Sequence, residues 1–467
     1  MKKKLIVIGN GMAGARLVSE VLARDGGDRF DITLFGDEPG GSYNRIMLSD
    51  VLNGSKSAAS IVLHPLEWYL ENNLTLHAGE RVTHVDVENR LVKGSKGTTE
   101  AFDCLVFATG SRAHVPPMDG VLTSDGERKA GVFVMRTLDD CERIAGYASK
   151  ANRAAVIGGG LLGLEAARGL MQHGAEVHLV HRSGCLMGAQ LDQDAGDMLR
   201  SAVEDMGIAV HLDKDTAEIL GDEAATGLRF KDGSELVCDM VVIATGIAPN
   251  VELARESGLP VEKAMLVDDQ MRVLDEIYAV GECAQHRGEV YGLVAPIWEQ
   301  ARVLADVLTQ KDPRAAYPGS KLAVKLKVMG IELAAMGDSR EREGDEVIRY
   351  AETRRGRYKK LIIRDNRLVG AILLGDVRKN AMLSQAFGRA MPLPEERASL
   401  LFDIGKAGGN DAQSLPDDAA VCNCNGVNAG KIRSCIQSGA SDLPMVMQQT
   451  RAGTGCGSCK SLVKQFL

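Results

Sequence analysis

The sequence predicts an α/β protein with two Rossmann-like units, and two observations lead to this fold class. A buried strand, a glycine-rich turn, an amphipathic helix and a second strand follow one another twice, over residues 4–35 and again over residues 154–180. Each unit is followed by an apolar segment that ends in Ala-Thr-Gly. In this context a GxGxxG turn indicates dinucleotide binding. The repetition predicts two bound dinucleotides, or one cofactor and one substrate.

Composition sets the broad class of the protein. The 467 residues correspond to about three domains. The net charge of −8 argues against a general nucleic-acid binder. No apolar stretch approaches the roughly 18 residues of a membrane span, and Gly9 interrupts the first apolar run too early for a signal peptide. We therefore expect a cytoplasmic protein, in which ten cysteines do not form a disulfide framework.

The first glycine turn, Gly9-Asn10-Gly11-Met12-Ala13-Gly14, lies between the first strand and its helix. In such a turn, bare backbone N–H groups approach a pyrophosphate at the positive end of the helix. The alternative is a turn that only tightens helix–strand packing, which its last glycine does in any case. An acid just past the second strand usually binds the adenosine ribose. Gly36 occupies the strand end, so we favour Asp37, with Glu38 as the second choice.

In the unit of the second glycine turn, Gly158-Gly159-Gly160-Leu161-Leu162-Gly163, the residues after the second strand differ from those of the first unit. His181 and Arg182 follow its second strand, and no acid stands there. An acid would repel a 2′-phosphate, whereas an arginine can accept one, so the sequence leaves NADPH open beside NADH. Glu165, two residues into the helix after the turn, is also explained by the preference of acids for helix N-termini.

Further along the chain, several segments continue the α/β pattern. Residues 277–281 form a third strand that ends in Gly281-Glu282, and a helix begins at Pro296 and includes Trp298. For Trp298, ordinary packing is the alternative to a place near a cofactor ring. Residues 317–400 alternate apolar and polar positions and predict an antiparallel sheet with helices. The basic run 354–360 is a solvated hairpin turn or a docking surface.

The cysteines near the C-terminus form two close pairs. Cys422 and Cys424 form a CxC motif, and Cys456 and Cys459 form a CxxC motif. Four such thiolates can enclose a [2Fe–2S] cluster, which we favour, or a tetrahedral zinc ion; unligated thiols are the third alternative. Cys435 is expected to be a packed core thiol. Residues 421–467 carry five basic residues and one acid, a net charge of +4 that either compensates a cluster or docks an acidic partner.

Taken together, these motifs resemble the two-dinucleotide-binding flavoprotein superfamily. The resemblance implies FAD at the first turn, a nicotinamide nucleotide at the second, and a carboxylate, here Glu282, that bonds the FAD ribityl chain. It also implies that Arg45 contacts the FAD phosphates and that Glu165 lies at the nicotinamide. The alternative for Arg45 is an ordinary surface arginine. The implied cofactor-binding residues are Gly9, Gly11, Met12, Ala13, Gly14, Asp37, Glu38, Arg45, Ala108, Thr109, Gly110, Gly158, Gly160, Leu161, Leu162, Gly163, Glu165, His181, Arg182, Gly246, Gly281, Glu282, Pro296 and Trp298.

A narrower resemblance follows from residues 43–49, 281–288 and 291–296. These segments resemble the FAD/NAD(P)H part of the large subunit of assimilatory nitrite reductases, and the cysteine tail resembles bacterioferritin-associated ferredoxin. The sequence ends at Leu467, without the further cluster cysteines of a sirohaem domain. We therefore expect the related electron-transfer subunit of assimilatory nitrate reductase. No cysteine precedes Cys104, so the redox cysteine pair of the superfamily's disulfide reductases is not expected.

These resemblances imply an enzyme that oxidises NADH, or NADPH, at FAD and passes electrons through a [2Fe–2S] cluster to a nitrate reductase catalytic subunit. We nominate no catalytic side chain, because the cofactors carry the chemistry. The alternatives are a reductase for a nitrite reductase, ferredoxin or rubredoxin-type acceptor, and an FAD protein with a metal-binding sensor tail. No nucleic acid or membrane partner is expected. The predicted parts are FAD-binding residues 1–113 and 246–316, an NAD(P)H-binding domain at 114–245, an α+β interface domain at 317–404, a linker at 405–420 and a helical [2Fe–2S] domain at 421–467.

Overall fold

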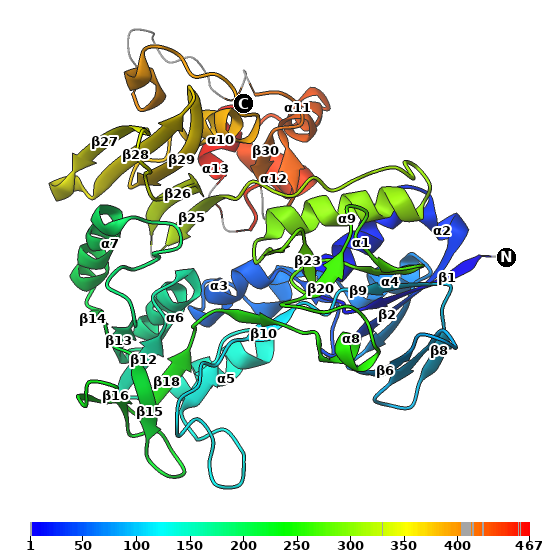
Figure 1. Ribbon diagram of the computed structural model, residues 1–467, viewed down its shortest axis with the longest axis horizontal. Coiled ribbons are helices and arrows are strands. Elements are labelled where there is room, and N and C mark those ends of the chain that lie inside the picture. The colour runs from blue at the N-terminus through cyan, green and yellow to red at the C-terminus, as the bar shows by residue number, and fades with distance from the viewer. Residues whose placement is uncertain are drawn as a thin grey trace. The chain divides into compact units, whose positions relative to one another are not determined.

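The computed structural model describes residues 2–328, 330–402, 412, 415–422, 425–455, 457 and 459–467. The chain divides into two compact units, coloured along the chain in Figure 1. The first comprises Met1–Arg45, Ser57–Arg112 and Ile247–Ser320, and the second comprises Ile46–Lys56, Ala113–Gly246 and Lys321–Leu467. The chain thus passes from one unit to the other after Arg45, Lys56, Arg112, Gly246 and Ser320. The last three crossings lie close to predicted domain boundaries, while residues 46–56 group with the second unit.

A six-stranded sheet in the order β21-β22-β9-β1-β2-β5 forms the centre of the first unit. All neighbours are parallel except β21 and β22, and the central strand β1 (Lys3–Ile8) is buried from Leu5 onward. The helices α1 (Met12–Leu22) and α9 (Val294–Leu308) pack against each other. The other strands of this sheet are β2 (Phe30–Gly36), β5 (Thr75–Ala78), β9 (Cys104–Phe107), β21 (Arg272–Leu274) and β22 (Ile277–Ala279).

The second unit begins with a five-stranded parallel sheet in the order β11-β18-β12-β13-β14. Its strands are β11 (Val132–Val134), β12 (Arg153–Ile157), β13 (Glu176–Val180), β14 (Ala209–His211) and β18 (Met240–Ile243). Its helices are α5 (Leu138–Ala148), α6 (Leu161–Gln172) and α7 (Gln193–Asp205). The short helix α3 (Leu48–Leu52) packs on α5 and α6, which explains why residues 46–56 belong to this unit.

An antiparallel sheet in the order β25-β26-β29-β28-β27 follows in the second unit, as the alternating pattern of residues 317–400 predicts. Its face packs with α10 (Asn380–Gly388) around a core that includes Leu361, Leu373 and Leu383. The strands are β25 (Ala323–Val328), β26 (Ile331–Gly337), β27 (Glu346–Glu352), β28 (Arg357–Arg364) and β29 (Arg367–Leu374). We call this part the interface domain.

The C-terminal domain is small and mainly helical. It contains β30 (Ala420–Cys422), β31 (Val427–Asn428), α11 (Ala429–Gln437), α12 (Leu443–Thr450) and α13 (Lys460–Lys464). Two of the helices have side-chain N-caps. The side chain of Asn428 accepts a hydrogen bond from the Lys431 N–H (2.9 Å) at α11, and the side chain of Asp442 accepts one from the Met445 N–H (2.8 Å) at α12. Ile46 packs against the core of this domain, and Lys56 Nζ donates to the Thr454 carbonyl (3.2 Å). Of the predicted linker 405–420, only residues 412 and 415–420 are among the described residues.

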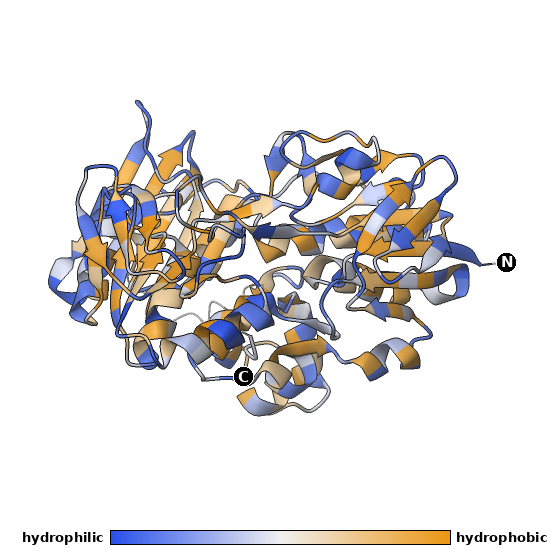
Figure 2. Ribbon diagram, turned by 90° about the horizontal axis from the view of Figure 1, so that it is seen from below, coloured by the Kyte–Doolittle hydropathy of each residue, from blue (hydrophilic) through white to orange (hydrophobic). Residues whose placement is uncertain are grey.

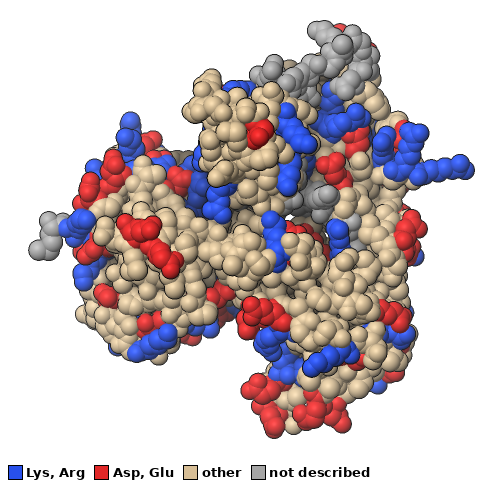
Figure 3. All heavy atoms as spheres, turned by 180° about the vertical axis from the view of Figure 1, so that it is seen from behind, with Lys and Arg blue, Asp and Glu red and all other residues tan. Residues whose placement is uncertain are grey.

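Hydrophobic segments follow the sheet strands and the inner faces of helices (Figure 2). Acidic and basic side chains are interspersed on the face drawn in Figure 3. Among the described residues, no helix combines the length and the apolar character that crossing a membrane requires.

The shorter elements are α2 (Gly26–Arg29), β3 (Ser42–Tyr43), β4 (Val62–His64), α4 (Leu66–Glu71), β6 (Val82–Asp86), β7 (Leu91–Gly94), β8 (Thr99–Ala101), β10 (Ser111–Ala113), β15 (Thr216–Leu220), β16 (Gly227–Phe230), β17 (Glu235–Val237), β19 (Ile247–Pro249), α8 (Glu252–Glu256), β20 (Met265–Val267), β23 (Ala284–His286) and β24 (Glu289–Val290).

Candidate cofactor sites

The first glycine turn connects β1 to α1, and its geometry requires glycine at two positions. Gly9 has a φ of +117°, and a Cβ atom on it would lie 2.2 Å from the Ala108 carbonyl oxygen. A Cβ on Gly14 would lie 2.0 Å from the Gly9 carbonyl oxygen. The turn therefore packs tightly against both the helix and the Ala-Thr-Gly segment. Met12 and Ala13, the first two residues of α1, are buried.

Arg45 lies in front of the N-terminus of α1. The N-cap residue is Gly11, which supplies no side-chain cap, and a Cβ on it would meet only the Nε and Nη2 of Arg45, each at 3.9 Å. The Arg45 guanidinium pairs with Glu38 and lies 5.2 Å from the centre of the Tyr43 ring. A helix N-terminus and a guanidinium side by side form an anion site, which suits the pyrophosphate of a dinucleotide.

The two predicted ribose acids have different surroundings. The Glu38 carboxylate accepts a hydrogen bond from the Tyr43 hydroxyl (2.7 Å) and pairs with Arg45. Asp37 directly follows β2 and is exposed. Glu38 thus holds Arg45 in place, and Asp37 is the carboxylate that remains accessible to a ribose.

The first Ala-Thr-Gly segment and Glu282 come together at the carboxyl ends of the neighbouring strands β9 and β22, where parallel α/β sheets bind their ligands. The Ser111 hydroxyl donates to Glu282 Oε2 (2.7 Å), and a Cβ on Gly110 would lie 4.0 Å from the same oxygen. The Gly281 N–H donates to Gln300 Oε1 (2.9 Å). Ser111 thereby fixes the orientation of the carboxylate that the family resemblance places at FAD.

Thr109 is tied to a loop of the same unit. Its hydroxyl donates to the Asn250 carbonyl (2.8 Å), and Asn250 Nδ2 donates back to the Thr109 carbonyl (2.9 Å). The Asn250 N–H also donates to the Gly110 carbonyl (2.9 Å). These bonds fix the backbone of the Ala108–Gly110 segment, and sequence reasoning missed Asn250 because it lies in an unremarkable Pro-Asn turn.

Helix α9 contributes a buried polar residue that sequence reasoning also missed. Gln300 is 0% exposed, and its Nε2 has no hydrogen-bond partner among the described residues. A buried donor without a partner is costly, and a bound cofactor with acceptor atoms would supply one. Trp298 is buried beneath the Arg16 guanidinium, 5.1 Å from its ring, so it packs against α1. Pro296 is buried in the first turn of the helix.

The second glycine turn repeats the steric pattern of the first. Gly158 has a φ of +129°, and a Cβ on it would lie 2.3 Å from the Ala244 carbonyl oxygen. A Cβ on Gly163 would lie 1.8 Å from the Gly158 carbonyl oxygen. Gly160 is the N-cap of α6, and a Cβ on it would meet no described atom within 4 Å. Open space before an uncapped helix N-terminus leaves backbone N–H groups accessible, which is the arrangement that binds a nucleotide pyrophosphate.

Residues around the second turn differ from those around the first. His181 Nδ1 accepts from the Gly159 N–H (3.1 Å), and burial lowers the pKa of His181. Arg182 is exposed, and Leu161, Leu162 and Glu165 are partly exposed on the first turns of α6. Gly246 has a φ of +117°, and a Cβ on it would meet no described atom within 4 Å. The structure thus brings these residues to one end of the nucleotide sheet.

The C-terminal domain places two of the four predicted cluster cysteines in one core. Cys422 and Cys459 are both buried there, 1% and 4% exposed. Cys424 and Cys456 lie outside the described residues. Cys435 packs in the same core and donates to Gln449 Oε1 (3.1 Å), which confirms that it is a packed thiol. One cysteine of each predicted pair, Cys422 and Cys459, therefore lies in the same small core.

Comparison with known families matches three successive parts of the chain. Residues 3–302 match the model of the pyridine nucleotide-disulphide oxidoreductases. Residues 323–390 match the rubredoxin NAD+ reductase C-terminal domain, and residues 420–467 match the BFD-like [2Fe-2S] binding domain.

Two curated relatives from Bacillus subtilis (strain 168) align with the whole chain. The protein named "Nitrite reductase [NAD(P)H]" is 42% identical over 470 residues, and the "Assimilatory nitrate reductase electron transfer subunit" is 38% identical over 468 residues. The chain spans only 57% and 59% of their lengths, so its length does not distinguish between them. A putidaredoxin reductase–putidaredoxin complex shares the fold, with 24% identity, a TM-score of 0.75, and coverage of 85% of this chain and 97% of that one.

Proposed function

The chain belongs to the pyridine nucleotide-disulphide oxidoreductase family, and from this premise we propose that it oxidises NAD(P)H, with NADH preferred. In this proposal the electrons leave through FAD and the [2Fe–2S] cluster of the C-terminal domain. The acceptor is the catalytic subunit of an assimilatory nitrate reductase. The observation that carries the proposal is the combination of two features in one chain. Two glycine turns with matching steric constraints each precede a helix without a side-chain cap, and a C-terminal domain holds Cys422 and Cys459 in its core.

Bound FAD would supply two-electron chemistry toward reduced nicotinamide and one-electron chemistry toward the cluster, so it would link a two-electron donor to a one-electron acceptor. The residues of this chain bind and position the groups. Arg45 and the N-terminus of α1 neutralise phosphate charge, and Ser111 holds the Glu282 carboxylate in one orientation. The Asp37 carboxylate binds the adenosine ribose. In the second unit, the N-terminus of α6 binds the nucleotide pyrophosphate, and His181 fixes the Gly159 backbone. Positioning is the protein's main contribution to such a reaction.

The four ligands of the proposed cluster are Cys422, Cys424, Cys456 and Cys459. A matched pair of variants tests this assignment. We expect Cys459→Ser to lose iron and acid-labile sulfide, while Cys435→Ser keeps both, because Cys435 bonds Gln449 within the core. Zinc in place of iron in the wild-type protein would overturn the cluster assignment and favour the sensor-tail alternative.

Anaerobic titration of the purified holoprotein with NADH, and separately with NADPH, tests the electron path. Visible absorbance follows the flavin, and electron paramagnetic resonance follows the cluster. We expect rapid bleaching of the flavin together with the appearance of a reduced [2Fe–2S] signal. Bleaching without a cluster signal, in protein with full iron content, would remove the cluster from the path.

A nitrite reductase is the second candidate acceptor, because the relative with 42% identity bears that name. The match of residues 323–390 to the rubredoxin NAD+ reductase C-terminal domain keeps a rubredoxin-type acceptor as a third. Reoxidation of the NADH-reduced protein by each purified acceptor separates them. Rapid reoxidation by the nitrate reductase catalytic subunit and slow reoxidation by the others is the expected result.

A further inference from the structure

Two adjacent lysines on β28 are buried on opposite faces of the interface-domain sheet. The sequence includes both in a basic run that reads as a solvated turn or a docking surface. The turn itself, at Arg354 and Arg355, is exposed. The side chains of Lys359 and Lys360, in contrast, are only 3% and 4% exposed, and each pairs with a carboxylate. Because successive residues of a strand face opposite ways, the two lysines serve different contacts.

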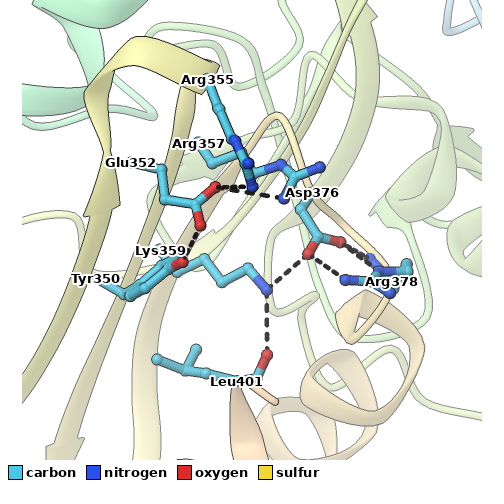
Figure 4. Close-up of polar contacts among 8 residues, drawn as sticks. All are labelled: Tyr350, Glu352, Arg355, Arg357, Lys359, Asp376, Arg378 and Leu401. Atoms are coloured by element: carbon cyan, nitrogen blue, oxygen red, sulfur yellow. Dashed lines mark hydrogen bonds and ion pairs between the residues drawn. The ribbon is translucent and has the colours of Figure 1, made fainter. Parts of the chain in front are cut away.

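Lys359 stabilises the interface domain from within (Figure 4). Its Nζ donates to Asp376 Oδ2 (2.9 Å) and to the Leu401 carbonyl (3.1 Å). The guanidinium of Arg378 bonds the same Asp376 carboxylate through two nitrogens, each at 2.9 Å. All of these partners belong to residues 321–402.

Lys360 bonds both its own domain, where its Nζ donates to the Ser339 carbonyl (3.2 Å), and the nucleotide-binding fold. Its Nζ donates to Asp192 Oδ2 (2.8 Å), and the hydroxyl of Tyr358, two residues earlier on the same face, donates to the same oxygen (2.8 Å). Asp192 is the N-cap of α7, where its other oxygen accepts from the Ala195 N–H (3.1 Å). These bonds lower the pKa of Asp192 against the opposing effect of its burial. The carboxylate thus accepts hydrogen bonds from donors of two domains.

Asp192 ends a loop that packs on the second glycine turn. This loop, residues 181–192, begins with His181, whose ring accepts from the Gly159 N–H (3.1 Å). In its middle, the Met187 N–H donates to the Gly159 carbonyl (2.9 Å), and the Leu191 N–H donates to the Met187 carbonyl (2.9 Å). The loop therefore holds both backbone polar groups of Gly159, while Lys360 and Tyr358 hold its far end.

We propose that Asp192, Tyr358 and Lys360 are positioning residues for nicotinamide-nucleotide binding. Through Asp192, the interface domain keeps the loop 181–192 seated against the second glycine turn. This inference rests on the proposed use of that turn for NAD(P)H. None of the three residues need touch the nucleotide, because displacement of supporting structure by about 1 Å is enough to weaken a positioned site.

Nucleotide binding to the oxidised holoprotein tests the proposal, with NAD+ and NADH titrated separately by calorimetry. We expect Lys360→Met to raise the dissociation constant about tenfold, because it frees the loop and leaves Asp192 uncompensated. Lys360→Arg restores the charge and the donor, and should bring the constant back toward the wild-type value. Tyr358→Phe removes one hydrogen bond and should raise it about threefold.

Lys359→Met is the matched control, since it removes an equally buried lysine from the neighbouring position. It should lower the thermal midpoint and leave the nucleotide dissociation constant unchanged. Equal weakening of binding by Lys359→Met and Lys360→Met would overturn the proposal, as would unchanged binding in folded Tyr358→Phe and Lys360→Met. Failure of the wild-type protein to bind either nucleotide would instead overturn the proposed function itself.

Discussion

The two glycine turns share their backbone constraints and differ in what surrounds them. A Cβ on the last glycine of each turn would lie 2.0 Å (Gly14) or 1.8 Å (Gly163) from the carbonyl of the first glycine. A Cβ on that first glycine, Gly9 or Gly158, would lie 2.2 or 2.3 Å from the alanine carbonyl of the Ala-Thr-Gly segment. These matching values explain why one motif recurs: the steric requirement is the same at both sites.

After the second strand the similarity ends. In the first unit the partly buried Arg45 pairs with Glu38 and lies near the Tyr43 ring, in front of the glycine turn. In the second unit a titratable His181 bonds the turn, and Arg182 is exposed. A fixed positive charge suits a retained cofactor, whereas weaker and exposed groups suit a nucleotide that must leave after each turnover. The surroundings of the turn, rather than its glycines, thus distinguish the two proposed ligands.

Adding a methyl group to the last glycine of each turn should have the largest effect. Gly14→Ala should release FAD, and Gly163→Ala should abolish tight nucleotide binding. Each substitution should lower the affinity for its own ligand on the order of 10²-fold, because the helix must move away from the turn. Flavin content and NAD+ calorimetry measure the two effects. The controls are Gly40→Ala and Gly146→Ala, where the added Cβ meets no described atom within 4 Å. Loss of both ligands in either variant would contradict independent sites.

Removing the arginine beside each turn should give a smaller and unequal effect. Arg45→Met should raise the dissociation constant for FAD about 10–100-fold, because it removes a charged partner of the phosphates. Arg182→Met should leave NADH binding unchanged and weaken NADPH binding, since only the latter carries a 2′-phosphate. Flavin fluorescence and calorimetry measure these constants. Equal weakening of NADH and NADPH by Arg182→Met would show that this arginine does not contact a 2′-phosphate.

Acidification should weaken only the second site, and this is the smallest expected effect. Burial keeps the pKa of His181 below its ordinary value, so the folded protein favours the neutral ring whose Nδ1 accepts from Gly159. The stabilisation is fully present above pH about 6.5. As the pH falls from there through the lowered pKa, it is lost, and nucleotide affinity should fall about two- to tenfold. Calorimetry at successive pH values measures this change. His181→Asn should remove the pH dependence, while FAD retention stays constant over the same range.

The sequence predicts features that depend on local geometry. Gly9 and Gly14 meet a backbone constraint of this tight turn between a strand and a helix, so the motif together with its strand and helix context identifies the turn. The alternation of residues 317–400 likewise predicts the antiparallel sheet, because strand faces have a period of two. The resemblance adds the cofactors to this frame.

Contacts between distant residues are less accessible from the sequence. The interpretation of the basic run as a solvated turn or docking surface is wrong for Lys359 and Lys360, whose carboxylate partners lie 17 and 168 positions away. Gln300 looks like an ordinary helix residue until its burial is known. Cys424 and Cys456 lie outside the described residues, so the cluster assignment depends on the sequence motif, the family match and the two buried cysteines.

The pairing of β9 with β22 has a consequence for synthesis of the protein. The Leu105 N–H donates to the Glu276 carbonyl, so the first sheet joins strands separated by the entire nucleotide-binding fold. At about 5–20 residues per second, a ribosome needs roughly 10–30 s to make the intervening chain. During that time β9 has no neighbour on its β22 side, and an unpaired strand edge is prone to aggregation. The nucleotide-binding fold, continuous from Ala113 to Gly246, can fold first and bring the two ends of the gap together.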